Sequence, residues 1–240
     1  MNFTACSIPY RQTKSFSKLS VDYVEGADAL KPFYTYAPNL HGIKEAIAQR
    51  KKYKVNRQGL VAQLQSQYTG KTLSPKATAN IEQLLSENTF TITTAHQPNI
   101  FTGHLYFIYK IIHAIKLADE LKKQFPGYHF VPVYFMGSED ADLEELGTIT
   151  VQGKIYTWAT HQKGAVGRMV IDEKFLALIH ELEAQLGVEK YGPEILAKLK
   201  QAYTKGKTIE LATFDFVHDL FGDYGLLVLL PDNPGFKKTF

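Results

Sequence analysis

The sequence predicts an α/β fold built on parallel strands. A β-branched run at 89–94, a helical pattern at 102–124 and a second apolar run at 128–135 follow one another, which is the order of a β-α-β unit with parallel strands. The continuous apolar run at 225–230 is typical of a strand covered on both faces. With 240 residues and 45% apolar content, the chain can bury a core of this kind.

Residues 1–88 differ in character from this pattern. Short helical patterns at 42–49 and 60–68 alternate with turn segments around Pro32, Pro38 and Pro75. We therefore expect residues 1–88 to be an N-terminal extension that packs on the core, and residues 89–240 to be the first part of the core itself.

Within the core, Thr102 is the expected N-cap of the long helix, and Pro126-Gly127 is expected to end it. Residues 147–160 predict a hairpin around Gln152-Gly153. Helical spacing at 172–186 and 193–205 predicts an inserted helical connecting segment at about 161–222.

Composition excludes several classes of protein. Lysine and arginine exceed the acids by only 27 to 24, and no aromatic-basic repeat accompanies the basic cluster at 50–54, so no nucleic-acid partner is expected. A single cysteine, Cys6, cannot form an intramolecular disulfide or a multi-thiolate zinc site, which favours a reducing, cytoplasmic setting without a metal. Residues 1–20 lack the apolar stretch of a signal peptide, and no membrane span is expected.

Three loops follow the predicted strands and are candidate binding loops: 96–103, 137–145 and 231–235. Ligands of open parallel sheets bind at the carboxyl ends of strands, where side chains from such loops and helix amides meet. We expect His96, Gln97, Glu139 and Asp140 to face one common cleft, because their loops leave neighbouring strands at the same edge.

In the first loop, Gly103 stands at the mouth of a helix, where an anion can approach the backbone. The string 102–105 is similar to the second half of the His-x-Gly-His signature of class I nucleotidyl transferases, although Phe101 departs from it. His104 is therefore a candidate phosphate ligand, with a surface or capping histidine as the alternative. His96 and Gln97 are candidates for contact with a substrate, and His96 is equally well read as a structural histidine.

The second loop holds five acids within seven residues. Carboxylates this close repel one another unless they bind a cation, an ammonium group or hydroxyls, or unless one has a raised pKa. Asp142, Glu144 and Glu145 also suit the start of a helix. Glu139 and Asp140, at the strand end, are the candidate catalytic pair.

Outside these loops, Gly167 and Arg168 lie in a glycine-rich segment at 164–169. A guanidinium offers a planar fork of donors, so this segment suits a carboxylate or a phosphate. An ordinary loop arginine is the alternative.

Several sequence blocks, in this order and spacing, resemble the cysteine-adding enzyme family of bacillithiol biosynthesis. They are Asp22-Tyr23, 94–103, 105–110, 131–133, 139–142, 166–168, and the strand leading to Asp232 and Pro234. Together they span nearly the whole chain. This chain departs from many members of the family in having His104 where they carry proline and Ala141 where they carry histidine.

The resemblance implies a Rossmann-like core with inserted connecting segments, akin to class I synthetases, and a later helical coiled coil. It implies a ligase that joins cysteine by an amide bond to glucosaminyl malate, both small molecules. The implied substrate- or nucleotide-binding residues are His96, Gln97, Asn99, Thr102, Gly103, His104, Asp142, Gly167 and Arg168. How the carboxylate is activated stays open; adenylation by ATP is the expected route.

Two alternatives remain at this point: another ATP-dependent nucleotidyl or acyl transferase on the same core, and a non-catalytic nucleotide-binding module. We also expect the chain to be an incomplete core, inactive alone, because only three parallel strands are predicted where about five or six are typical. The apolar strand at 225–230 is then expected to be poorly covered and to promote self-association, with a homo-oligomer compatible with the sequence.

Overall fold

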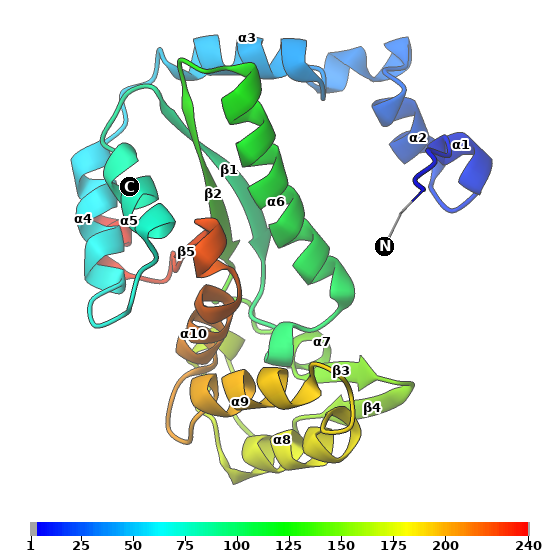
Figure 1. Cartoon of the computed structure of the whole chain (residues 1–240), viewed down its shortest axis with the longest axis vertical. Helices are drawn as coiled ribbons and strands as arrows, with labels where there is room; N and C mark the ends of the chain where they lie inside the picture. The colour runs from blue at the N-terminus through cyan, green and yellow to red at the C-terminus, as the bar shows by residue number, and fades with distance from the viewer. Residues whose placement is uncertain (1–3, 240) are drawn as a thin grey trace. The chain divides into compact units, whose positions relative to one another are not determined.

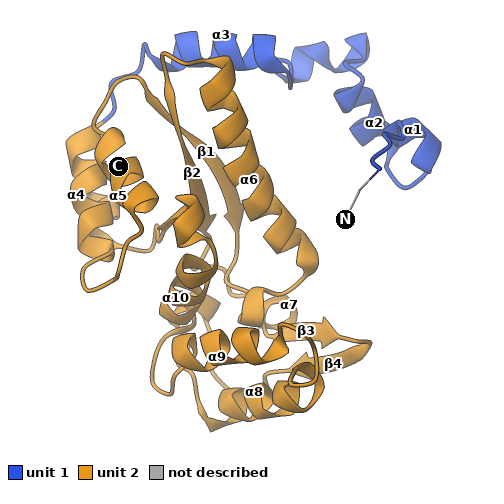
Figure 2. Cartoon of the chain, in the orientation of Figure 1, with its two compact units in different colours: residues 1–55 blue, residues 56–240 orange. Residues whose placement is uncertain are grey.

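The computed structural model describes residues 4–239 and divides the chain into two compact units, Met1–Val55 and Asn56–Phe240 (Figure 2). The first unit is helical, with α1 (Tyr10–Thr13), α2 (Lys18–Val24), the 3-10 helix η1 (Asp28–Phe33) and α3 (Leu40–Arg50). Ser17 and Asn39 cap α2 and α3 by accepting from Ser20 and Gly42 amides. Arg11 donates to Glu25 and ties α1 to the end of α2.

The second unit is an α/β domain around a parallel sheet (Figure 1). Its strands are β1 (Thr89–His96), β2 (His129–Met136) and β5 (Leu227–Leu229), in the order β1-β2-β5, with both pairings parallel. The helix α6 (Leu105–Gln124) connects β1 to β2. The predicted β-α-β unit is therefore confirmed, and β1 extends two residues beyond the expected strand, to His96.

The other elements of this unit are α4 (Arg57–Gln67), α5 (Pro75–Gln83), η2 (Ile100–Thr102), α7 (Leu143–Leu146), β3 (Thr148–Val151), β4 (Lys154–Thr157), η3 (Val166–Arg168), α8 (Glu173–Leu186), α9 (Gly192–Ala202), α10 (Ile209–Phe221), η4 (Gly222–Tyr224) and α11 (Pro234–Thr239). The antiparallel pair of β3 and β4 confirms the predicted hairpin. Gln152 and Gly153 form its turn with φ of 49° and 81°, the left-handed values that a tight hairpin turn requires.

Two apolar cores lie within this unit. One joins the sheet to α4, α5, α6 and α10, and the other lies among the hairpin, α8, α9 and α10. Helix α10 belongs to both, because Phe214 and Val217 pack into the first core while Ile209 and Phe216 pack into the second. A helix buried on two sides loses the one-sided apolar stripe by which helices are recognised, which explains why 209–221 was not singled out within the expected helical segment.

The observed division falls between Val55 and Asn56, not at the boundary expected after residue 88. The reason lies in α4 and α5, since Val61, Leu64 and Ile81 are buried in the sheet core. Arg57 adds two hydrogen bonds to the carbonyl groups of Leu84 and Thr89, at 2.9 and 3.1 Å. Residues 56–88 are thus part of the α/β unit.

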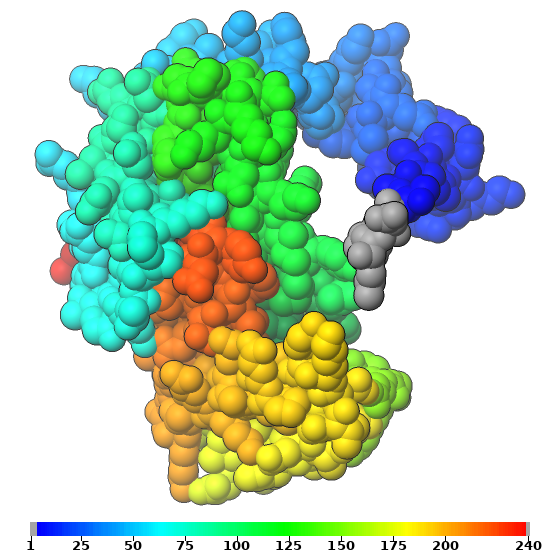
Figure 3. Space-filling view, in the orientation of Figure 1, coloured from blue at the N-terminus to red at the C-terminus, as the bar shows by residue number. Residues whose placement is uncertain are grey.

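The strand β5 is well covered, contrary to expectation. Leu227 and Val228 are fully buried. The orange atoms between the surfaces of α4–α5 and α6 in Figure 3 belong to the exposed part of the segment that leads into β5, where Tyr224 is 58% exposed. The outer edge is closed by α4 and the residue after it: Val228 donates to the Tyr68 hydroxyl (2.7 Å), and the Gln67 amide bonds to Val228 and Leu230. Side chains therefore satisfy backbone groups that another strand would otherwise pair.

Candidate active site

The carboxyl ends of β1 and β2 form the floor of the candidate site. His96 is aligned with Met136, so the two following loops leave the same edge of the sheet. A pocket of about 490 Å³, open to solvent, lies there and is lined by Ala95, His96, Gln97, Phe135, Gly137, Glu139 and Asp140. All four residues that were predicted to face one cleft line this pocket, which confirms that prediction; they are His96, Gln97, Glu139 and Asp140.

Gln97 and Asp140 link the two loops directly. The Gln97 amide donates to Asp140 Oδ2 at 3.0 Å, and the backbone N–H of Asp142 donates to Oδ1 at 3.2 Å. These two hydrogen bonds, that of Gln97 first, hold the pKa of Asp140 below its ordinary value. Asp140 is therefore a carboxylate at neutral pH, suited to accepting hydrogen bonds from a substrate and not to acting as an acid.

His96 lies half-buried at the last position of β1. Its ring packs against Tyr106 and Phe107, with centroids 5.2 and 5.4 Å away. Its Nε2 is buried and has no hydrogen-bond partner within residues 4–239. Burial, followed by the charge of Lys110, lowers the pKa of His96. A neutral imidazole with one unsatisfied nitrogen fits contact with a polar group of a substrate, and it also fits a bound water.

A cluster of ion pairs adjoins the pocket through Glu139, the member of the cluster that lines it. Arg168 makes a bidentate pair with Asp232, through Nε at 2.6 Å and Nη2 at 2.8 Å, and lies 3.8 Å from Glu139. Lys237 donates to Asp232 at 2.7 Å and to Glu139 at 2.6 Å. Hydrogen bonds from Arg168 and Lys237 lower the pKa of Asp232 to about 2. The cluster joins the loop after β2, η3 and the segment after β5.

Gly167 allows η3 to approach the end of β2. A Cβ at this position would lie 2.5 Å from the Cβ and carbonyl oxygen of Ser138, closer than real side chains come. The Gly167 amide donates to that same carbonyl at 3.1 Å, and the Val166 amide donates to the Asp140 carbonyl at 2.8 Å. Gly167 thus acts through backbone packing, which places its neighbour Arg168 beside Glu139.

Three candidate residues of the first loop, Asn99, Thr102 and Gly103, pack inside the loop and do not line the pocket. Asn99 is buried, and neither its side-chain oxygen nor its nitrogen has a hydrogen-bond partner in the part of the chain that the structure describes. Thr102 does not cap α6, as had been expected, because it lies in η2 with φ of 73°, next to Phe101 at 52°. Gly103 follows with φ of 63° and packs tightly on Asn99. Two successive strained non-glycine residues are a feature that functional loops retain at a cost in stability.

His104 and Asp142 are also placed away from the pocket wall. His104 occupies the N-cap position of α6 without a side-chain capping bond, and its exposed ring stacks on Tyr106 at 5.7 Å. Asp142 caps α7 by accepting from the Glu145 amide at 3.2 Å. For Asp142, Glu144 and Glu145, the helix-start interpretation is the one that the geometry supports.

Sequence reasoning missed Asp232, Lys237 and Glu210 as site residues. Asp232 follows a strand within a loop already considered, so its position at a strand end was a usable signal. Lys237 and Glu210 had no such signal, because only the tertiary packing of α11 and α10 places them near Arg168.

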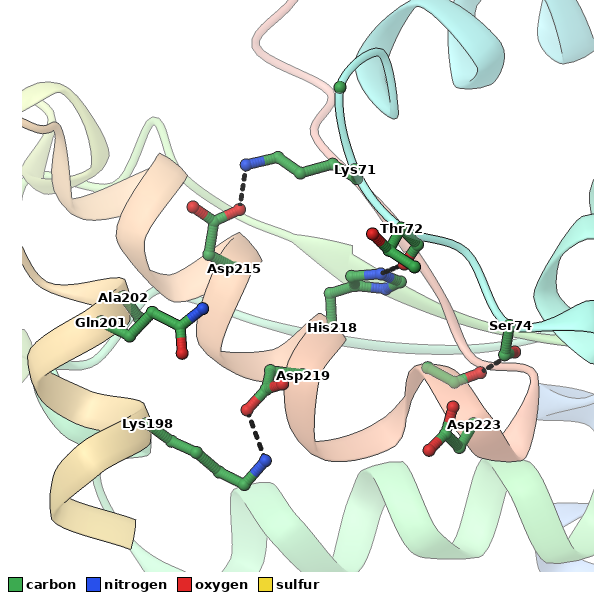
Figure 4. A pocket seen from close by; sticks show the side chains of 12 residues that line it. Lys71, Thr72, Ser74, Lys198, Gln201, Ala202, Asp215, His218, Asp219 and Asp223 are labelled. Atoms are coloured by element: carbon green, nitrogen blue, oxygen red, sulfur yellow. Dashed lines mark hydrogen bonds and ion pairs between the residues drawn. The ribbon is translucent and has the colours of Figure 1, made fainter. Parts of the chain in front are cut away.

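A second pocket, of about 460 Å³, lies between the 70–74 segment, α9 and α10 (Figure 4). Four of its charged side chains form ion pairs: Lys71 with Asp215 at 2.5 Å and Lys198 with Asp219 at 2.6 Å. His218 bonds to the Thr72 carbonyl at 2.9 Å. These contacts connect α10 to its neighbours. Among the described residues, Nδ1 of His218 has no hydrogen-bond partner, as is also true of Nε2 of His96 in the strand-end pocket. The strand-end pocket is the candidate site because it lies at the carboxyl ends of the parallel strands.

The parallel sheet, its connecting helices and the pocket at the strand ends define a Rossmann-like α/β domain. The whole chain, residues 1–240, matches the family described as "Bacillithiol biosynthesis BshC, N-terminal Rossmann-like domain". The chain belongs to this family.

Relatives from several bacteria carry the name "Putative cysteine ligase BshC". Those from Cytophaga hutchinsonii and Flavobacterium psychrophilum are 40% and 39% identical over 99% and 97% of this chain. One from Natranaerobius thermophilus is 30% identical over 92%. The chain spans 44% of the length of the first two relatives and 43% of the third. Among the helices of residues 4–239, none is long and apolar enough to cross a bilayer.

Proposed function

We propose that the natural protein joins the carboxyl group of cysteine to the amino group of glucosaminyl malate, forming the amide of bacillithiol, and that this chain supplies part of its site. The observation that carries the proposal is the family match over residues 1–240, together with relatives named as cysteine ligases. The strand-end pocket supports the location, because it collects polar side chains from two loops at the edge where such sheets bind ligands.

The chemistry requires activation of a carboxylate, which does not react with an amine directly. Transfer of an adenylyl group from ATP to the carboxylate, with release of pyrophosphate, would give an acyl group that the amine attacks with loss of AMP. Holding the two reactants in line supplies much of the rate gain in such a reaction. In this proposal Asp140, Gln97 and His96 contact the substrates. Lys237 fixes the position of the Glu139 carboxylate by donating a hydrogen bond to it.

A nucleotidyl or acyl transferase with another substrate is the second candidate. Its support is the start of α6, where Gly103 turns the chain and His104 leaves the first-turn amides without a side-chain cap. Such amides are a favourable place for an anionic group.

Mass spectrometry of the whole natural protein with cysteine, glucosaminyl malate and ATP tests the proposal. The expected product has the summed mass of the two substrates less one water, and its formation should depend on ATP. Turnover of a different acid without this product would favour the second candidate. Unchanged cellular bacillithiol after deletion of the gene would favour a non-catalytic module.

A further inference from the structure

Glu210 is a charged side chain beside the pocket that the proposed reaction leaves without a role. It lies in the first turn of α10, whose start is fixed next to η3: the Ile209 amide donates to the Met169 carbonyl at 2.9 Å, and Thr208 pairs with Val170. Helix α10 packs against η3. Glu210 consequently comes close to Arg168 and to Ser138 at the end of β2.

Two buried polar atoms lie beside each other in this corner. Ser138 is fully buried, and its hydroxyl is next to the Glu210 carboxylate. Among the described residues, neither this hydroxyl nor Oε2 of Glu210 makes a hydrogen bond of normal geometry. Buried polar atoms in folded proteins are nearly always satisfied, so a bound group or a water is expected between them. Both oxygens can accept, and a primary ammonium, with three donors, can satisfy both at once.

The charges around Glu210 are also unbalanced. Three carboxylates and two cations are close together here. The carboxylates are Glu139, Asp232 and Glu210, and the cations are Arg168 and Lys237. The cations are engaged by Asp232 and Glu139, whereas Oε2 of Glu210 accepts no hydrogen bond of normal geometry from the residues that the structure describes. Burial first, then the charges of Asp232 and Glu139, raise the pKa of Glu210, although Arg168 and Ser138 act against this. One added positive charge would balance the group.

We propose that Glu210 and Ser138 form a subsite for a primary ammonium group of a substrate. The assignment rests on the proposed function, which supplies two such groups: the α-ammonium of cysteine and the amino-sugar ammonium of glucosaminyl malate. Were the amino sugar the occupant, its ammonium would pass one proton to the Glu210 carboxylate, leaving a neutral amine able to attack and a neutral carboxylic acid.

Calorimetric titration of the whole natural protein distinguishes the two sources by matched ligand pairs. The first pair is L-cysteine and 3-mercaptopropionate, which lacks the ammonium; the second is glucosaminyl malate and glucosyl malate, which has a hydroxyl in its place. We expect the amine of one pair to bind about 10- to 100-fold more tightly than its partner, as a charged hydrogen-bonded contact predicts. Glu210→Gln should abolish that preference, and Ser138→Ala should reduce it.

Glu144→Gln, at an exposed acid in the first turn of α7, is the matched control and should keep the preference. Since the folded protein raises the pKa of Glu210, its ionised form destabilises the fold at neutral pH. Glu210→Gln should therefore melt at or above the wild-type temperature at pH 7. If Glu210→Gln is unfolded at pH 7, the loss of preference between the amine and its partner is measured in Ser138→Ala.

Loss of preference in the cysteine pair assigns the subsite to cysteine, and loss in the sugar pair assigns it to the amino sugar. Three outcomes would overturn the proposal: equal affinities within both pairs, no binding of either amine, or a preference that survives Glu210→Gln. In each case a bound water would be the occupant of the space beside Glu210 and Ser138. Because binding is measured without turnover, a preference that the wild type shows and Glu210→Gln loses, found together with no amide product, would refute the reaction alone. Product formation with an unchanged preference in Glu210→Gln would refute the subsite alone.

Discussion

Asp140 is the residue whose geometry most directly suggests contact with a substrate. Its carboxylate is exposed on the pocket wall and hydrogen-bonds to Gln97 and to the Asp142 amide. Asp140→Asn should lower kcat/KM of the natural protein about 10- to 100-fold while leaving the melting temperature nearly unchanged, because a crowded, exposed charge contributes little to folding. Steady-state kinetics and thermal melts measure the two effects.

Glu144→Gln is the control for this substitution, and its effect on activity should be much smaller. Parallel losses of activity and melting temperature in Asp140→Asn would show instead that Asp140 serves the fold.

Asp232 predicts a pH dependence of stability. Its pKa in the fold is about 2, below the ordinary value of about 3.9, so its pairing stabilises the protein above pH 4 and is lost as pH falls from about 4 to 2. Asp232→Asn should lower the free energy of unfolding by about 1–2 kcal/mol at pH 7, allowing for screening of the exposed Arg168. Urea unfolding at several pH values checks this; a difference that stays constant down to pH 2 would contradict it.

At the scale of elements, the approach of η3 to β2 depends on Gly167. A methyl group there would meet Ser138 backbone atoms that cannot move aside easily. Gly167→Ala should therefore cost about 1–3 kcal/mol of stability and displace Arg168 from Asp232. Urea unfolding measures the first effect, and a crystal structure of the variant shows the second.

Gly127→Ala is the matched control, because nothing lies within 4 Å of a Cβ at that position. A destabilisation of Gly127→Ala equal to that of Gly167→Ala would point to a general cost of replacing glycine and not to this contact.

The closure of the β5 edge gives a second prediction at this scale. Tyr68→Phe removes the hydroxyl that accepts from the Val228 amide and leaves a buried N–H unsatisfied. The expected cost is about 1–3 kcal/mol, measured by urea unfolding. Tyr224→Phe, at a side chain that is 58% exposed, should have no measurable effect. If Tyr68→Phe leaves the free energy of unfolding unchanged, a water takes the place of the hydroxyl.

For the whole molecule, we predict that the 240 residues alone form no condensed thiol. Within residues 4–239 the parallel sheet has three strands, and the chain covers 44% of the length of the relatives from Cytophaga hutchinsonii and Flavobacterium psychrophilum. A crevice between two halves of a nucleotide-binding sheet is typical of such folds. Mass spectrometry of this chain beside the natural protein tests the point; full condensation activity of a stable 240-residue monomer would refute it.

The sequence by itself determined the order and type of the main elements. The β-branched run from Thr89, the apolar runs to Phe135 and from Leu226, and the turn at Gln152-Gly153 fixed the parallel sheet and the hairpin, because local periodicity and turn chemistry act over a few residues. The blocks around His96 and Glu139 also identified the family and the edge of the sheet that carries the pocket.

Only the tertiary structure decided which side chains meet. Arg168 comes from η3, whereas Asp232 and Lys237 come from the segment after β5. Glu210 reaches them through the packing of α10 against η3. Helix α10 was not predicted as a separate helix, because two cores bury its opposite sides. The strand β5 was expected to be poorly covered, because the residues that cover it, Gln67 and Tyr68 at the end of α4, are far away in the chain. Contacts between distant segments depend on how packed elements orient their side chains, and local sequence patterns carry no record of that arrangement.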